Sequence, residues 1–218
     1  MHSGMSRTKA INKLNKLLED KMKKRLAIIT VILCLAFPLA AFAGAALDAV
    51  KGNVDKVLDV LRDPSLKSES SKQIKKNKIR AIGDNMFDFT ELSKRTLAVN
   101  WSKFTPEQQK EFISLYKDLL ADTYADKIVA YTDEKIVFTK EVSLTEKTIE
   151  VQSTVIRKTQ EVPIYYRVIK ENGSWLVYDV VIEGVSLVNN YRTQFREILS
   201  NKPPTSLIET LKKKVGRA

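Results

Sequence analysis

The sequence predicts an α+β fold in which amphipathic helices pack against a single antiparallel, curved sheet of about four strands. Apolar residues recur at three- and four-residue spacing as far as about residue 128, and this spacing is typical of helices. Between residues 136 and 182 they instead alternate with polar residues, which is typical of strands. Because 44% of the 218 residues are hydrophobic, the chain can build a core.

Residues 1–43 are expected to be a targeting segment rather than part of this domain. A basic triplet, Lys23 to Arg25, precedes a short apolar run, and Ala41-Phe42-Ala43 follows it. This is the pattern of a secretory signal peptide over residues 22–43 that is cleaved after Ala43, with an uncleaved anchor as the alternative. We interpret residues 1–21 as an over-extended start or as a longer basic lead. The domain itself is then expected to span residues 44–218 of an exported, periplasmic protein.

Removing this segment changes the composition from which function is argued. It contains eight of the 37 Lys and Arg residues and two of the 26 Asp and Glu residues, so the net charge falls from +11 to +5. His2 and Cys34 are removed as well, which leaves no His and no Cys. A nearly balanced charge argues against nucleic-acid binding. The absence of His and Cys excludes the common nucleophile–base pairs and the usual zinc ligands, but it leaves a carboxylate-only site open. We expect neither an enzyme nor a cofactor.

Four helices are expected before the sheet. Residues 45–62 form an amphipathic pattern that Pro64 ends, and residues 68–82 form a charged, solvated helix. A short helix over residues 91–99 follows. Thr105 is the predicted N-cap of a long helix to about residue 128, because Pro106 follows it directly and a Gln stands three residues on, as in a capping box.

The strands and the last helices are marked by turns and breakers. The expected strands lie near residues 136–138, 149–155, 162–168 and 175–182. Asn172-Gly173 predicts a tight turn between the last two, and Glu183-Gly184 is expected to end the sheet. Ser186 is the predicted cap of a helix over residues 187–199, and Pro203-Pro204 separates it from a helix over residues 205–215.

Three stretches resemble the MlaC family, also called the toluene-tolerance family. They are Phe87-Asp88-Phe89 with Leu97 and Trp101; Thr105 to Phe112 with Leu119-Leu120 and Thr123-Tyr124; and Trp175 to Leu187 with Asn190-Tyr191-Arg192 and Phe195. The resemblance implies a fold similar to the nuclear-transport-factor cone, enclosing an apolar cavity. It also implies a monomeric phospholipid carrier that shuttles between an inner-membrane ABC transporter complex and an outer-membrane lipoprotein complex and maintains outer-membrane lipid asymmetry.

Candidate lipid-binding residues lie on the apolar faces of the long helix and of the strands. The candidate cavity walls are Phe112, Leu115, Tyr116, Leu119 and Tyr124 on the helix, and Ile149, Val151, Val155, Val162, Ile164, Tyr166, Val168, Leu176, Tyr178 and Val180 on the strands. For each of them the alternative is a filled core. Asn190 and Arg192 are headgroup candidates, or they lock the C-terminal helix to the sheet, with Arg192 paired to Asp179 or Glu183.

Three other functions fit parts of the pattern. A carrier of another lipid, such as a hopanoid, would share most of it. A periplasmic chaperone or adaptor would use an exposed apolar groove to bind unfolded polypeptide. An enzyme on the same scaffold would need a carboxylate base such as Asp179 beside Tyr178 or Tyr166.

Overall fold

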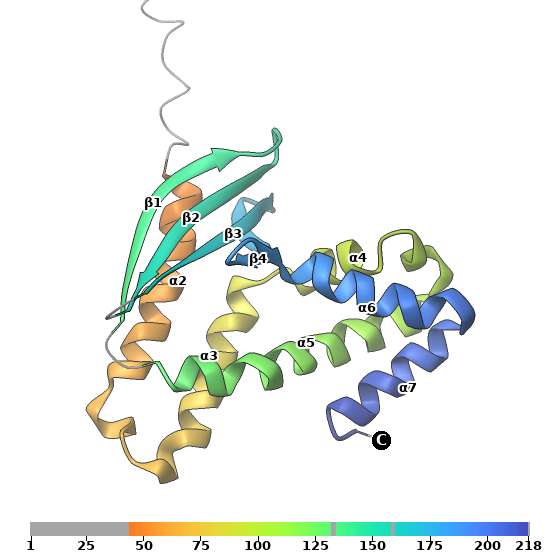
Figure 1. Cartoon of the computed structure of the whole chain (residues 1–218), viewed down its shortest axis with the longest axis horizontal. Helices are drawn as coiled ribbons and strands as arrows, with labels where there is room; N and C mark the ends of the chain where they lie inside the picture. Colours follow the sequence, from red (N-terminus) through yellow and green to blue (C-terminus); the bar gives the residue numbers. More distant parts are fainter. Residues whose placement is uncertain (1–43, 132–133, 158–159, 218) are drawn as a thin grey trace, which may run out of the picture. The chain divides into compact units, whose positions relative to one another are not determined.

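The elements occur in the predicted order, with helices first, strands next and two helices at the end (Figure 1). The computed structural model describes residues 44–131, 134–157 and 160–217, so the predicted signal peptide lies outside the described residues. No helix within these ranges is long and apolar enough to cross a membrane. The elements are α2 (Ala45–Arg62), α3 (Lys72–Met86), α4 (Phe89–Leu97), α5 (Pro106–Val129), β1 (Lys135–Ser143), β2 (Thr148–Ile156), β3 (Glu161–Glu171), β4 (Ser174–Ile182), β5 (Val185–Ser186), α6 (Leu187–Asn201) and α7 (Pro204–Lys214).

The five strands form one antiparallel sheet in the order β1-β2-β3-β4-β5, which confirms the predicted fold class. Asn172 and Gly173 both have positive φ, 48° and 84°, as a two-residue hairpin turn requires. The expectation that Glu183-Gly184 ends the sheet is wrong. These residues make a second turn of this kind, with φ of 49° and 82°, and β5 returns to pair with β4.

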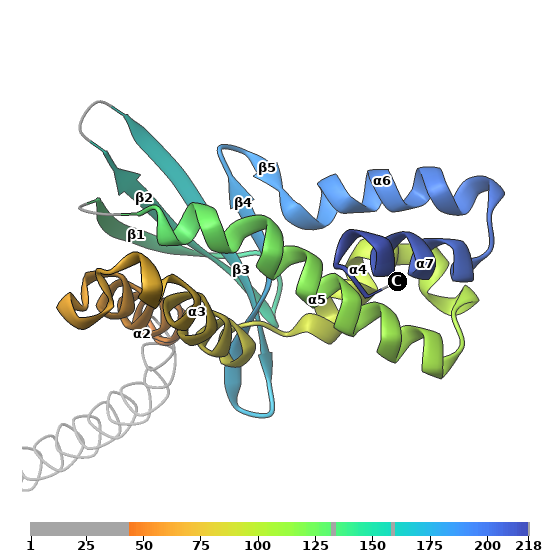
Figure 2. The same ribbon diagram turned by 90° about the horizontal axis from the view of Figure 1, so that it is seen from below.

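The buried apolar side chains form two clusters, and the partly buried Phe87 packs against both. The first, which we call the α2–sheet cluster, joins α2 to one face of the sheet. The second, which we call the helical cluster, contains side chains of α4, α5, α6 and α7. Helix α2 contacts β1, β2 and β4, whereas the main contacts of α4 and α6 with the long strands are at β4 (Figures 1 and 2).

The predicted capping box at the start of α5 is present. The Thr105 hydroxyl accepts from the Gln108 backbone N–H at 3.3 Å, and the Gln108 side chain accepts from the Thr105 N–H at 3.0 Å. Two N–H groups that the helix leaves without an internal partner are thereby satisfied.

Replacing Thr105 with Ala is expected to lower the free energy of unfolding by about 1 kcal/mol, because the cap hydroxyl is lost. Urea denaturation measures this difference. Ser102→Ala is the matched control, because the Ser102 hydroxyl is exposed and its contact with the Val99 carbonyl is long, at 3.4 Å. Equal midpoints for wild type and Thr105→Ala would show that the cap contributes nothing.

Candidate functional site

The α2–sheet cluster is built from alternate residues of the strands and one face of α2. Val151 and Val168 are fully buried, and Val177 and Val180 of β4 lie beside them. The amphipathic face of α2 supplies Ala46, Val50, Val54 and Leu58, and α3 adds Met86. This cluster positions the candidate site because it defines which side of the curved sheet is apolar.

Around this cluster lies a ring of apolar side chains that the chain covers only in part. We call it the apolar margin; it comprises Leu47, Leu61, Phe87, Tyr131, Ile136, Phe138, Ile149, Ile164, Tyr166, Trp175, Ile182 and Leu187, all packed against the cluster but partly exposed. Within it the rings of Phe138 and Tyr166 stack at 6.4 Å. Apolar side chains that stay partly accessible beside a packed core are candidates for contact with an apolar ligand or partner.

The polar groups on this face include hydroxyls, which keep their protons at physiological pH, and the Glu141 carboxylate, which accepts from backbone N–H groups at the start of α2. Ser153 donates to the Ile164 carbonyl at 2.7 Å. Burial and, to a smaller extent, the nearby Glu134 carboxylate raise the pKa of Tyr131 to about 12; burial also raises the pKa of Tyr166 well above its ordinary range. The Tyr131 hydroxyl is buried with no hydrogen-bond partner among the described residues. The face therefore offers apolar contact, a few uncharged hydroxyls and one carboxylate that is held by the start of α2.

These pKa shifts predict that the protein loses stability in alkali. Burial raises the folded-state pKa of Tyr131 to about 12, and those of Tyr166 and Tyr116 also rise. Above about pH 10 the unfolded chain releases phenolic protons that the folded chain keeps, so the free energy of unfolding falls as pH rises. The test follows phenolate formation by absorbance at 295 nm and unfolding by circular dichroism, together from pH 9 to 13. We expect some tyrosine hydroxyls to lose their protons only when the protein unfolds. Complete titration of an intact fold near pH 10 would contradict this account.

The predicted cavity residues on α5 lie in the helical cluster, away from the α2–sheet cluster. Phe112, Leu115, Tyr116 and Leu119 are buried there, and Tyr124 packs against them. The rings are in direct contact: Phe112 and Tyr116 meet Phe195 of α6 edge-to-face at 5.7 and 5.4 Å. The α5 set and most of the strand set therefore belong to different clusters. In the structure, the fully buried α5 rings serve as packed core.

A β-bulge changes which face some predicted residues of β4 occupy. The sequence suggests that Leu176, Tyr178 and Val180 alternate onto one face. The register shifts opposite Arg167 and Val168, so that Val177 and Val180 both join the α2–sheet cluster. Tyr178 instead packs beneath the Arg95 guanidinium of α4, which lies 4.0 Å from the ring centre.

The other predicted strand residues lie with the α2–sheet cluster or in register beside it. Val151 and Val168 are in the cluster itself, and Ile149, Ile164 and Tyr166 belong to the apolar margin. Val155 is buried and pairs directly with the half-buried Val162 across β2 and β3. Contact of these residues with lipid stays a prediction.

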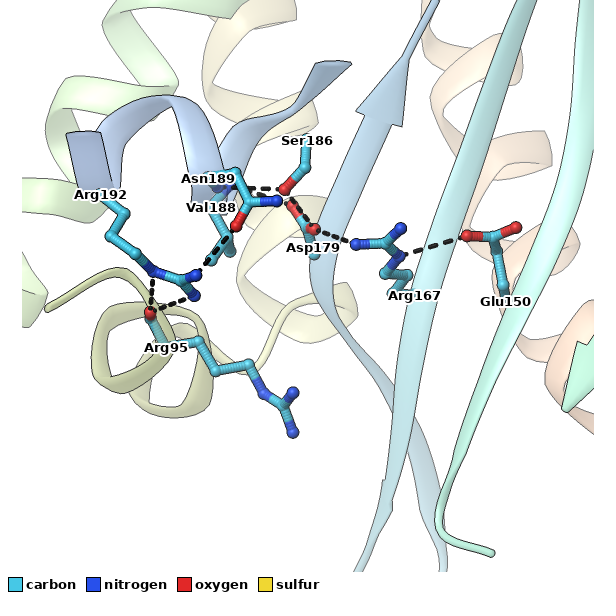
Figure 3. A network of polar contacts seen from close by, with 8 residues as sticks. All are labelled: Arg95, Glu150, Arg167, Asp179, Ser186, Val188, Asn189 and Arg192. Carbon is cyan, nitrogen blue, oxygen red and sulfur yellow. Dashed lines mark hydrogen bonds and ion pairs between the residues drawn. The ribbon is translucent and has the colours of Figure 1, made fainter. Parts of the chain in front are cut away.

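Of the two headgroup candidates, Arg192 holds α6 against α4 rather than against the sheet (Figure 3). The Arg192 guanidinium donates twice to the Arg95 carbonyl of α4, at 3.1 and 2.7 Å, and once to the Asn189 side chain at 3.0 Å. The expected pairing of Arg192 with Asp179 or Glu183 is therefore wrong, because a carbonyl of α4 takes that place. Asn190 is exposed and accepts from Gln194 on the same helix.

Asp179 is the centre of a buried network that starts α6 (Figure 3). Its carboxylate accepts from the Ser186 hydroxyl at 2.7 Å, from the Val188 N–H at 3.0 Å and from Arg167 at 3.2 Å. Arg167 also pairs with Glu150. With its oxygens committed to these donors, Asp179 is a structural group rather than a free base. Within residues 44–131, 134–157 and 160–217, no group of three or more carboxylate, His or Cys side chains could hold a metal ion.

Comparison with known proteins identifies the family. The family model described as MlaC protein matches residues 51–213. The chain belongs to the MlaC family. It is 25% identical over 172 residues to toluene tolerance protein ttg2D of Pseudomonas putida, covering 78% of this chain and 80% of that protein. It is also 25% identical over 128 residues to the intermembrane phospholipid transport system binding protein MlaC of Haemophilus influenzae, covering 56% and 60%.

A solved structure of similar fold contains a lipid. The phospholipid-binding protein from Ralstonia solanacearum, determined in complex with a phospholipid, superposes with a TM-score of 0.69 and 27% identity. The match covers 79% of this chain and 97% of that one. The MlaC resemblance carried by the three sequence stretches is thereby confirmed, as is the predicted fold class.

Several residues that the structure brings together on this face could not be predicted from the sequence. The contributions of α2 and of Met86, Tyr131 and Ile136 to this face were not predicted. The amphipathic pattern of α2 is visible in the sequence, but the pattern alone does not say which partner its apolar face covers.

Proposed function

We propose that this chain is a soluble phospholipid carrier of the MlaC family, exported to the periplasm. The main support for the proposal is the structural match to a phospholipid-bound protein, which covers 97% of that protein's chain. The apolar margin supports it independently, because it provides partly accessible apolar surface beside a packed core. The names of the two curated relatives, which refer to toluene tolerance and phospholipid transport, agree with it.

The physical requirement on such a carrier is large. Two acyl chains with roughly 30 methylene groups, at about 0.8 kcal/mol each, would cost more than about 20 kcal/mol if they were fully exposed to water. A soluble carrier must therefore cover the tails, whereas a charged headgroup can stay in water. The apolar face between α2 and the sheet meets the first condition, because the hydroxyls of Tyr131 and Tyr166 keep their protons and the Glu141 carboxylate is held by the first turn of α2.

The tails are proposed to lie along the apolar margin rather than in the helical cluster. The rings of the helical cluster are packed against one another at 5.2 to 5.8 Å and are buried, so they serve as filled core. The tails are then proposed to contact Ile149, Ile164 and Tyr166, which are predicted cavity residues on the strands. They would also contact Ile136 and Phe138 of β1, which were not among the predicted residues.

The carrier is proposed to act as a monomer between an inner-membrane ABC transporter complex and an outer-membrane lipoprotein complex. Transport by a soluble carrier needs no energy-coupling cofactor of its own, since a membrane partner can supply the energy. In this role the protein would help to maintain outer-membrane lipid asymmetry.

A vesicle transfer assay tests the proposal. Donor vesicles containing fluorescent phosphatidylethanolamine are mixed with residues 44–218 and then with unlabelled acceptor vesicles. We expect label in the protein fraction first and in the acceptor vesicles later. Failure to extract phospholipid would overturn the proposal. Uptake of a hopanoid alone, or binding of an unfolded polypeptide without lipid, would point instead to the two alternative functions.

A further inference from the structure

The helix α2 begins at a residue that cannot cap it with a side chain. Gly44 is the N-cap and has a φ of +108°, a conformation that strongly favours glycine. The capping carboxylate comes from β1, 97 residues further along the chain: Glu141 Oε2 accepts from the Gly44 N–H at 3.1 Å. Glu141 Oε1 accepts from the Leu47 N–H at 2.5 Å. One carboxylate thus fastens the first turn of α2 to the edge strand of the sheet.

The same glycine directly follows the small-x-small sequence Ala41-Phe42-Ala43. We propose that the Ala43–Gly44 bond is the processing site and that Glu141 receives the α-ammonium group which cleavage creates. The inference rests on the export proposed above. In the reaction a signal peptidase uses water: the hydroxyl joins the Ala43 carbonyl carbon, one proton joins the Gly44 nitrogen, and the amine takes a second proton from solvent.

Cleavage changes the chemistry of the Gly44 nitrogen but not its place beside Glu141. An amide with one N–H becomes an ammonium with three N–H groups and a full positive charge, at ion-pair distance from the carboxylate. A positive charge at a helix N-terminus is disfavoured by the helix dipole. The Glu141 carboxylate therefore decides whether processing strengthens or weakens the start of α2.

The other charged groups at this end of α2 are few. Asp48 lies in the first turn of the helix, and Lys140 precedes Glu141 but is exposed. Lys51, one turn further on, pairs with Asp55. The neighbouring strand β2 places Val151 opposite Glu141, so it adds no charge there. The new amine therefore has Glu141 as its principal ionic partner, with Asp48 acting in the same direction.

The consequence concerns the lipid face. Because α2 covers one side of the α2–sheet cluster, anchoring its first turn to β1 fixes one border of the apolar margin. Processing would then do more than release the chain from its targeting segment. It would add the ion pair that completes the attachment of α2 to the sheet.

The processing site is tested by exporting the full chain in a Gram-negative host and measuring the intact mass of the periplasmic product. We expect a chain that begins at Gly44. A mature chain with any other first residue would overturn the proposal, because its ammonium group would not lie beside Glu141.

The ion pair is tested on residues 44–218, which form a compact unit of their own. Thermal unfolding is compared for chains with a free and an Nα-acetylated Gly44, each with Glu141 and with Glu141→Gln. With Glu141, we expect acetylation to lower Tm by about 2–4 °C. With Glu141→Gln, we expect acetylation to leave Tm unchanged or to raise it, because a charge that the helix dipole disfavours is removed. The same shift in both backgrounds would overturn the ion pair.

If Glu141→Gln fails to fold, a titration of the Gly44 amine in the unmutated chain tests the ion pair instead. The pKa of the Gly44 amine in the native protein, followed by NMR, should exceed the ordinary α-amino value of about 7.7–8.0. The resulting stability is present below that value and is lost as pH rises through the folded-state pKa. A pKa at or below the ordinary value would contradict the pairing. Bound phospholipid is measured on the same samples. A protein that contains lipid but has an ordinary amine pKa would contradict the ion pair alone, whereas a protein without lipid would contradict the carrier function.

Discussion

A Phe138→Asp variant is expected to lose most of its bound phospholipid while keeping its fold. Phe138 belongs to the apolar margin, stacks on Tyr166 and is partly exposed on the edge strand β1. A carboxylate at this position would have to be desolvated against acyl chains, which costs several kcal/mol, and each 1.4 kcal/mol is a factor of ten in affinity. Phospholipid extracted per mole of protein should fall by at least about tenfold, as measured by quantitative mass spectrometry.

Val137→Asp is the matched control, because Val137 is the neighbouring residue of the same strand and points to the opposite face. It is half-buried, like Phe138, and pairs with Thr154, whereas Phe138 pairs with Ser153. The two variants carry the same charge on the same edge strand. Equal lipid loss in both, or full retention in Phe138→Asp with a native circular dichroism spectrum, would show that tails do not lie on this face.

An Asp179→Ala variant is expected to lose about 3–5 kcal/mol of stability, because it removes the anionic partner of a buried network. Asp179 is 2% exposed and holds the Ser186 hydroxyl, the Val188 N–H and Arg167 at the junction of β4 and α6 (Figure 3). Its loss leaves donors without partners and weakens the start of α6. Urea denaturation should show a large decrease in the transition midpoint, corresponding to a Tm lowered by about 10 °C or more.

Asp55→Ala provides the comparison for this variant. Asp55 forms an exposed ion pair with Lys51, and both side chains are about half exposed. Such pairs contribute about 0–1 kcal/mol. If Asp179→Ala were no more destabilised than Asp55→Ala, the carboxylate would not organise the junction, and its role as a base would need to be considered again.

Most of the elements follow from local sequence signals. The apolar spacing of α2, the Thr105 capping box and the alternation in β2 and β3 each act within a few residues, so the chain order of helices and strands could be predicted. Ser186 is likewise the cap of α6, as its position before an apolar helical pattern predicts. Glu183-Gly184 could not be assigned in this way, because the same turn either ends a sheet or begins a further strand.

The division of the apolar residues between two clusters could not be predicted from periodicity. A pattern states that Phe112 and Val151 are each buried, but not that they are buried in different places. The bulge opposite Arg167 and Val168 changes the faces of the β4 residues, and no single residue marks it. Long-range partners such as Glu141 for Gly44, or the Arg95 carbonyl for Arg192, depend on tertiary packing and leave no local signal.

The most direct test of the carrier account is native mass spectrometry of residues 44–218 purified from a Gram-negative periplasm without detergent. If the protein carries phospholipid, we expect a population heavier than the protein by the mass of one or two glycerophospholipids. Collisional activation should release these as intact lipid. The heavier population should be depleted in Phe138→Asp and retained in Val137→Asp. A protein that has only its bare mass, both as purified and after incubation with phospholipid vesicles, would contradict the account.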